Sequence, residues 1–206
     1  MNAIAFASRV TRGVAFAFAL AIAIASASVG TGCKSNDASP ERKVAPTAAP
    51  AVDTALMAYL SEARALHHHA DIDEDRGKLD EAIATMKRLV QLRLPANGPK
   101  SPEVQEVLAD SYARLAELEL KLGNVVAAGQ SLDKGFEHAP EATYFRGHLV
   151  ELKGLLEEAR AKALADAGQA AQAETARREA IRLFDEAVRI QDQFIERTLD
   201  AGGTKP

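Results

Sequence analysis

Apolar residues recur every three or four positions from residue 53 onward, and this spacing predicts a series of amphipathic helices. In one segment, for example, Leu108, Tyr112 and Leu115 lie on the same side of a helix. The strict apolar–polar alternation that is typical of strands does not occur in the sequence. The sequence therefore predicts an all-helical fold of about six helices, at residues 53–75, 79–90, 101–122, 125–136, 141–167 and 170–199.

Three short segments of this helical region resemble one another. Each has a glycine, then a polar residue, and an alanine five positions after the glycine, and the glycines are 46 and 45 residues apart. A fixed period of this size is typical of a stacked array of helical units. Glycine readily takes the left-handed conformation that ends a helix, and a small alanine lets two helices approach closely, so each segment predicts a helical hairpin. The pairs are Gly77 with Ala82, Gly123 with Ala128, and Gly168 with Ala173.

The segment from Tyr112 to Pro140 resembles the tetratricopeptide-repeat family. The matching residues are Tyr112, Leu115 and Ala116 in the first helix, Gly123 in the turn, and Ala128, Leu132 and Pro140 in the second helix. A weaker unit precedes it around Gly77, and a third, around Gly168, fits two registers. The resemblance implies stacked antiparallel helical hairpins, a TPR-like α-solenoid over residues 53–200. Because the period exceeds the 34 residues of that family, longer helices or loops are expected, and an unrelated helical bundle is the alternative.

The resemblance also implies a binding site. In the tetratricopeptide-repeat family, ligand peptides lie in a concave groove lined by the first helix of each hairpin. The corresponding residues here are Arg64, His67, Asp71, Asp110, Ala113, Arg114, Glu117 and Lys121. Their mixed charges favour a polar or amphipathic peptide segment over an acidic tail as the partner. The alternative interpretation is that each of these residues is simply exposed on a helix surface.

The first 32 residues have the layout of a secretory signal. Arg9 and Arg12 precede an apolar run at 14–24, and small residues then lead to Cys33, the only cysteine. The segment Gly30–Cys33 resembles the lipobox of bacterial lipoproteins, which implies cleavage before Cys33, acylation of its thiol and anchoring in the cell envelope. Lys34, in place of an aspartate, favours the outer membrane, with the protein facing the periplasm. The alternatives are an uncleaved membrane helix, cleavage near residues 25–27, and a free thiol.

Composition and charge restrict the function further. Residues 34–52 are rich in Ala, Ser and Pro, which predicts a flexible tether, and residues 201–206 are expected to form a disordered tail. The chain has 25 basic and 29 acidic residues, and loss of Arg9 and Arg12 with the signal leaves a net charge of −6. This balance argues against nucleic-acid binding, which needs a basic surface.

The histidine run at 67–69 with Asp71 and Asp73 has the composition of a metal site. Adjacent residues on a helix point about 100° apart, so three consecutive histidines cannot all face one ion. His69 and Asp73, four apart, share a face, and no metal site or cofactor is expected. Catalytic sequence motifs are also missing, so an enzyme is not expected. The predicted function is a membrane-tethered adaptor that binds an envelope protein in assembly, secretion, pilus or cell-wall scaffolding. The alternatives are a lipoprotein that binds a metal or small ligand and a structural helical bundle, and the oligomeric state is open.

Overall fold

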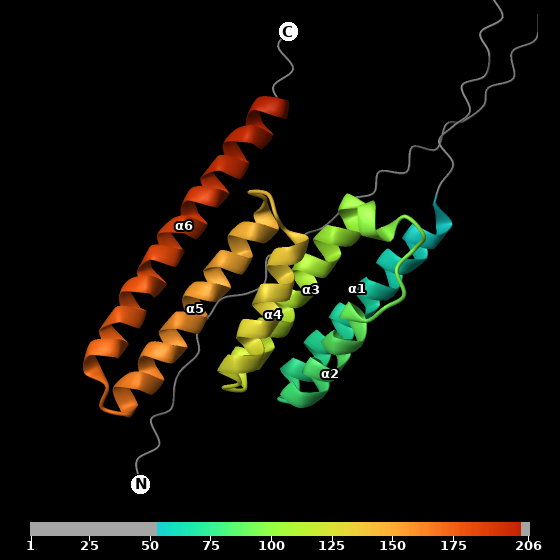
Figure 1. The fold of residues 1–206 in the computed structure, drawn as a ribbon. Coiled ribbons are helices and arrows are strands. Elements are labelled where there is room, and N and C mark those ends of the chain that lie inside the picture. The colour runs from blue at the N-terminus through green and yellow to red at the C-terminus, as the bar shows by residue number, and fades with distance from the viewer. Residues whose placement is uncertain (1–52, 203–206) are drawn as a thin grey trace, which may run out of the picture. The chain divides into compact units, whose positions relative to one another are not determined.

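A computed structural model of the chain describes residues 53–202, and every regular element in that range is helical (Figure 1). The helices are α1 (Thr54–Asp75), α2 (Leu79–Val90), the 3-10 helix η1 (Gly98–Lys100), α3 (Pro102–Lys121), α4 (Val125–His138), α5 (Tyr144–Asp166) and α6 (Ala170–Gly202). The prediction of an all-helical fold is confirmed for this range. The predicted signal at 1–32, Cys33, the tether and residues 203–206 lie outside the described residues.

Side-chain hydrogen bonds cap the first turns of α1 and α5. The Asp53 carboxylate accepts hydrogen bonds of 3.0 Å from the backbone N–H groups of Ala55 and Leu56 and so caps the start of α1. The Thr143 hydroxyl caps α5 in the same way. At the other end of the chain, α6 continues through residues 201 and 202, which the sequence placed in a disordered tail.

The three predicted bends have the same backbone structure. Gly77, Gly123 and Gly168 have φ angles of +73°, +82° and +73°, in the left-handed region. In the first bend, the Gly77 N–H donates to the Glu74 carbonyl at 2.7 Å, and the Lys78 N–H donates to the Asp73 carbonyl at 2.8 Å. The equivalent bonds run from Gly123 to Leu120 and Asn124 to Glu119 in the second bend, and from Gly168 to Ala165 and Gln169 to Leu164 in the third. This is the hydrogen-bond pattern of a Schellman motif, which satisfies the last carbonyl groups of a helix.

The repeated alanines also have equivalent positions. Ala82, Ala128 and Ala173 are each fully buried where the second helix of a hairpin leaves the bend. A side chain larger than a methyl group at these positions would push the paired helices apart. The glycine and the alanine of each repeat therefore act together, since one turns the chain and the other lets the helices pack. The resulting hairpins are α1–α2, α3–α4 and α5–α6, called hairpins 1, 2 and 3 below.

The hairpins pack side by side in chain order. Helix α3 contacts both helices of hairpin 1, and α5 contacts both helices of hairpin 2 (Figure 1). Leu115 and Leu118 of α3 complete the apolar core of hairpin 1, and Leu149, Leu152 and Leu156 of α5 complete the core of hairpin 2. The apolar side of each of the first two hairpins is thus covered by the first helix of the next hairpin.

Candidate partner-binding surface

The first helices of the hairpins lie next to one another, because α3 contacts both α1 and α5. All the residues that the resemblance implicates in binding lie on α1 and α3. Arg64 is exposed on α1, one turn before His67. The first-helix face is defined here as the side of α1, α3 and α5 that carries Arg64, His67, Asp71, Glu74, Asp110, Arg114, Glu117, Lys121, His148 and Glu151.

Five charged residues of this face form an ion-pair network between hairpins 1 and 2. The guanidinium of Arg114 on α3 lies 2.9 Å from Oδ1 of Asp71 on α1 and also pairs with Glu74. Its other terminal nitrogen lies 2.7 Å from Oε2 of Glu117. Nζ of Lys121 lies 2.6 Å from Oε1 of Glu74 and 2.7 Å from Oε1 of Glu117. The two cations therefore connect α1 to α3 through shared carboxylates.

The ion pairs of the network favour the charged forms of Glu117, Glu74 and Lys121. Burial alone would raise the pKa of Glu117, but hydrogen bonds from Lys121 and the positive charge of Arg114 outweigh it and lower that pKa. The pKa of Glu74 is lowered by the same two partners against the same effect of burial. Burial would lower the pKa of Lys121, but its hydrogen bonds to Glu117 and Glu74 raise it.

Sequence analysis identified four of the five network members and missed Glu74. The spacing of the sequence already indicated Glu74, because it follows Asp71 by three positions and His67 by seven and so shares their helix face. The sequence could not indicate that the implicated residues pair with one another. That pairing depends on how closely α1 and α3 approach.

His67 and Asp110, which the resemblance implicates separately, also lie close together. Nε2 of His67 lies 3.7 Å from Oδ2 of Asp110 and 3.1 Å from Oγ of Ser111. The Ser111 hydroxyl donates to the carbonyl of Val107 at 2.6 Å, so its oxygen accepts from the His67 Nε2–H. Burial lowers the pKa of His67 despite the neighbouring carboxylates of Asp110 and Asp71, and the ring is neutral at pH 7.

Helix α5 contributes a histidine and a carboxylate that the sequence did not assign to this face. Nδ1 of His148 lies 3.5 Å from Oε2 of Glu151. This hydrogen bond raises the pKa of His148, and the carboxylates of Asp110 and Glu117 on α3 raise it further. Helices α3 and α5 are in contact, and the carboxylates of α3 act on His148, so His148 and Glu151 are counted in the first-helix face.

Ala113 was expected on the surface, but it is buried. It is 1% exposed and packs in the core that α3 shares with α4 and α5, together with Ala109 and Leu149. The reason is helix geometry: α5 covers the side of α3 on which Ala113 lies. Ala113 is therefore the one residue of the implicated set that is corrected, because its side chain is not accessible.

The histidine run gives a pair and no larger cluster. Nε2 of His69 lies 3.7 Å from Oδ2 of Asp73, as their four-residue spacing predicts. His67 instead turns toward α3. Within residues 53–202, no group of three or more histidine, cysteine, aspartate or glutamate side chains is arranged to hold a metal ion.

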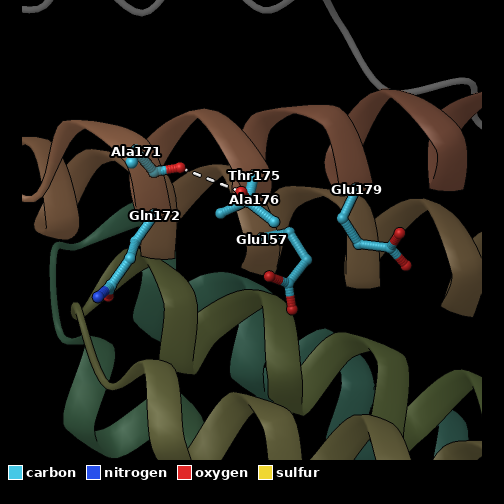
Figure 2. Close-up of a pocket in the computed structure, with 6 residues that line it drawn as sticks. All are labelled: Glu157, Ala171, Gln172, Thr175, Ala176 and Glu179. Atoms are coloured by element: carbon cyan, nitrogen blue, oxygen red, sulfur yellow. Dashed lines mark hydrogen bonds between the residues drawn. The ribbon is translucent and has the colours of Figure 1, made fainter.

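A pocket between α5 and α6 lies apart from the first-helix face (Figure 2). Figure 2 shows the carboxylates of Glu157 from α5 and Glu179 from α6 projecting into it. Each carboxylate is already paired with an arginine of its own helix: Glu157 with Arg160 at 2.5 Å, and Glu179 with Arg182 at 2.7 Å. The pocket therefore does not offer two unpaired carboxylates to a ligand.

In the range that the structure describes, no helix combines the length and the apolar character needed to cross a membrane. Comparisons of the chain with protein-family models, with curated proteins and with solved structures gave no match. A function is therefore inferred from the sequence and geometry of the chain itself.

Proposed function

We propose that this protein is a non-enzymatic adaptor, a TPR-like helical-repeat lipoprotein that binds a protein or peptide partner on its first-helix face. One observation carries the proposal: three hairpins with the same glycine bend pack in series with their first helices adjacent. Such an arrangement presents one extended polar surface that runs across several helices. Extended surfaces of stacked helical units suit the binding of an extended chain or a helix.

The charges of the face favour a partner segment with basic or hydrogen-bond-donating side chains. The Asp71 and Glu151 side chains are 51% and 56% exposed, whereas that of Arg114 is 19% exposed and enclosed by three carboxylates. Asp71 and Glu151, with Asp110 at 47%, are thus more accessible to a partner than Arg114, while Lys121 is 42% exposed. Desolvated pairs between these carboxylates and partner lysines or arginines would give specificity and fast association.

The setting proposed for this adaptor is the bacterial cell envelope, and this proposal rests on the sequence of residues 1–52 alone. Acylation of Cys33 would anchor the chain, and the 19 residues from 34 to 52 would form a tether spanning about 25 Å. The folded part would then stand clear of the lipid headgroups and face the periplasm. Mass spectrometry of the mature amino terminus tests this address: an unmodified Cys33, or a start at another residue, would contradict it.

Partner capture tests the binding face. Crosslinking in the native envelope identifies the attached protein, and charge reversal then shows where it binds. Reversal of Arg114 or Lys121 would also break ion pairs between hairpins 1 and 2, so Asp110→Lys with Glu151→Lys is the cleaner variant. We expect this double variant to lose co-purification of the partner by tenfold or more, as about 1.4 kcal/mol would give. Asp133→Lys, at an exposed position of α4, is the matched control. Undiminished capture by the double variant would reject this face.

A further inference from the structure

Helix α6 is far longer than the second helices of the other hairpins. It has 33 residues, whereas α2 has 12 and α4 has 14. The side-chain amide of Gln191 donates to the Tyr144 carbonyl at the start of α5, at 3.2 Å. The part of α6 after Gln191 therefore continues past the end of its partner helix, as Figure 1 shows. Arg197 ties this extension to the α4–α5 connection through the Ala142 carbonyl.

Four large apolar side chains of α6 are exposed. Ile181, Val188, Ile195 and Leu199 are between 53% and 70% exposed, and they are four of the ten large apolar residues exposed within residues 53–202. The first three are seven residues apart, so they form one stripe along the helix. The stripe is separate from the buried side of α6, where Leu183 and Ile190 pack against α5. The last helix of a stacked array normally ends in a polar face, which this stripe interrupts.

The charges beside the stripe are arranged in a complementary order. Arg178 lies on one flank of the stripe near its start, Asp185 and Arg189 lie on the same flank near its middle, and Asp192 and Glu196 lie there toward its end; all five are exposed. The other flank carries Phe184, Gln191 and Thr198. When two helices pair in antiparallel orientation, like flanks face each other, whereas in a parallel pair opposite flanks do.

From this order we propose that α6 pairs with α6 of a second copy of the chain, in antiparallel orientation about a two-fold axis at Val188. Val188 then opposes its own equivalent, and Ile181 opposes Ile195. Arg178 comes within about 3 Å along the helix axis of Glu196 of the second copy, by the rise of 1.5 Å per residue. Asp185 and Arg189 are matched in the same way, whereas Asp192 comes within about 1.5 Å along the axis of Asp185 of the second copy, which is an unfavourable pair. In a parallel pair, these charges would face the uncharged flank and gain no partners.

The contact is small, and the pairing is therefore weak. The segment from Ile181 to Leu199 is about 27 Å long, and a contact strip about 10 Å wide would bury roughly 300 Å² per copy. A standard stable interface buries about 800 Å² per partner. We expect a dissociation constant in the micromolar range or above. Pairing would double the number of first-helix faces in one assembly and raise the avidity for a repetitive partner.

Disulfide trapping tests both the pairing and its orientation. In the full chain with Cys33→Ser, each introduced cysteine is the only thiol. On mild oxidation, Val188→Cys should form a covalent dimer, because its equivalent lies opposite. Ile181→Cys and Ile195→Cys should crosslink poorly alone and efficiently when mixed. Val126→Cys, which is 76% exposed on α4, is the matched control and should stay monomeric.

Each outcome decides the proposal. Monomeric Val188→Cys would overturn it, and it would also show that any occupant of the stripe is a different protein. Efficient crosslinking of Ile181→Cys with itself would overturn the antiparallel arrangement. In the Val188→Cys chain, adding Ile195→Asp should reduce crosslinking at least severalfold. This inference does not depend on the proposed adaptor function, because partner capture and disulfide trapping use different surfaces.

Discussion

Nζ of Lys87 on α2 lies 3.5 Å from Oε1 of Glu119 on α3, although Glu119 is only 2% exposed. The second carboxylate oxygen of Glu119 accepts a hydrogen bond of 2.7 Å from the Ser131 hydroxyl on α4. One buried carboxylate therefore connects hairpin 1 to both helices of hairpin 2. A buried charge is costly unless it is paired, so the two partners of Glu119 determine how much it destabilises the fold.

Removal of the cation of this pair should destabilise the protein more than removal of both charges. Lys87→Met leaves Glu119 buried with one hydrogen bond, and we expect a loss of about 1–3 kcal/mol in the free energy of unfolding. Lys87→Met combined with Glu119→Leu should recover most of that loss, because no charge stays buried. Urea unfolding measures both values. Equal stability of Lys87→Met and the unchanged chain would show that Lys87 contributes nothing to the pair.

Replacing glycine by alanine should have opposite effects on stability at the bend and inside α4. Gly123→Ala should lower the free energy of unfolding by about 1 kcal/mol, since a left-handed residue with a Cβ atom costs 1–2 kcal/mol. The added methyl group meets no atom within 4 Å, so the cost is conformational. Gly129→Ala, inside α4, adds a methyl group in ordinary contact and should stabilise the helix by roughly 0.5–1 kcal/mol. Thermal unfolding of the two variants compares these opposite signs.

The ion-pair network should make the free energy of unfolding depend on pH in the acidic range. Glu74 and Glu117 have lowered pKa values in the folded state, and their usual value is 4.5. Their contribution is therefore complete above pH 4.5 and is lost as the pH falls through the folded pKa values. Arg114→Met should reduce stability at pH 7 and flatten this acid dependence, as measured by urea unfolding between pH 7 and pH 3. An unchanged pH profile would mean that Arg114 does not lower these pKa values.

His67 and His148 should titrate on opposite sides of the usual histidine pKa of 6.5. Burial lowers the pKa of His67, so its stabilising effect is present above pH 6.5 and is lost as the pH falls. Hydrogen bonding to Glu151 raises the pKa of His148, so its effect is present below pH 6.5 and is lost as the pH rises through the folded pKa. NMR titration of the imidazole signals measures both pKa values, and His67→Gln and His148→Gln assign them. The reverse order of the two pKa values would contradict the described contacts.

Zinc titration separates the adaptor from the alternative metal-binding function. The His69–Asp73 pair supplies two ligands, fewer than the three or four protein ligands of ordinary zinc sites. We therefore expect no binding heat at micromolar zinc in calorimetry. Heat that disappears in His69→Gln would instead favour a metal-binding lipoprotein.

Features that depend on short stretches of chain could be predicted from the sequence. The bends at Gly77, Gly123 and Gly168 are local, because a positive φ angle and the hydrogen bonds around it involve only about six consecutive residues. The helices follow from apolar periodicity for the same reason. The end of α6 was predicted three residues early, at 199 and not at 202, since the exact end of a helix is only weakly fixed by the sequence.

Relationships between helices needed the tertiary structure. Asp71 and Arg114 are 43 residues apart, and their pairing depends on the approach of α1 to α3. The same holds for the burial of Ala113 beneath α5 and for the position of His148 beside the carboxylates of α3. A helix face can be read from the order of residues along one helix. Which face is covered, and by what, is settled by packing between helices, because burial and charge pairing act through space and are not encoded by spacing along the chain.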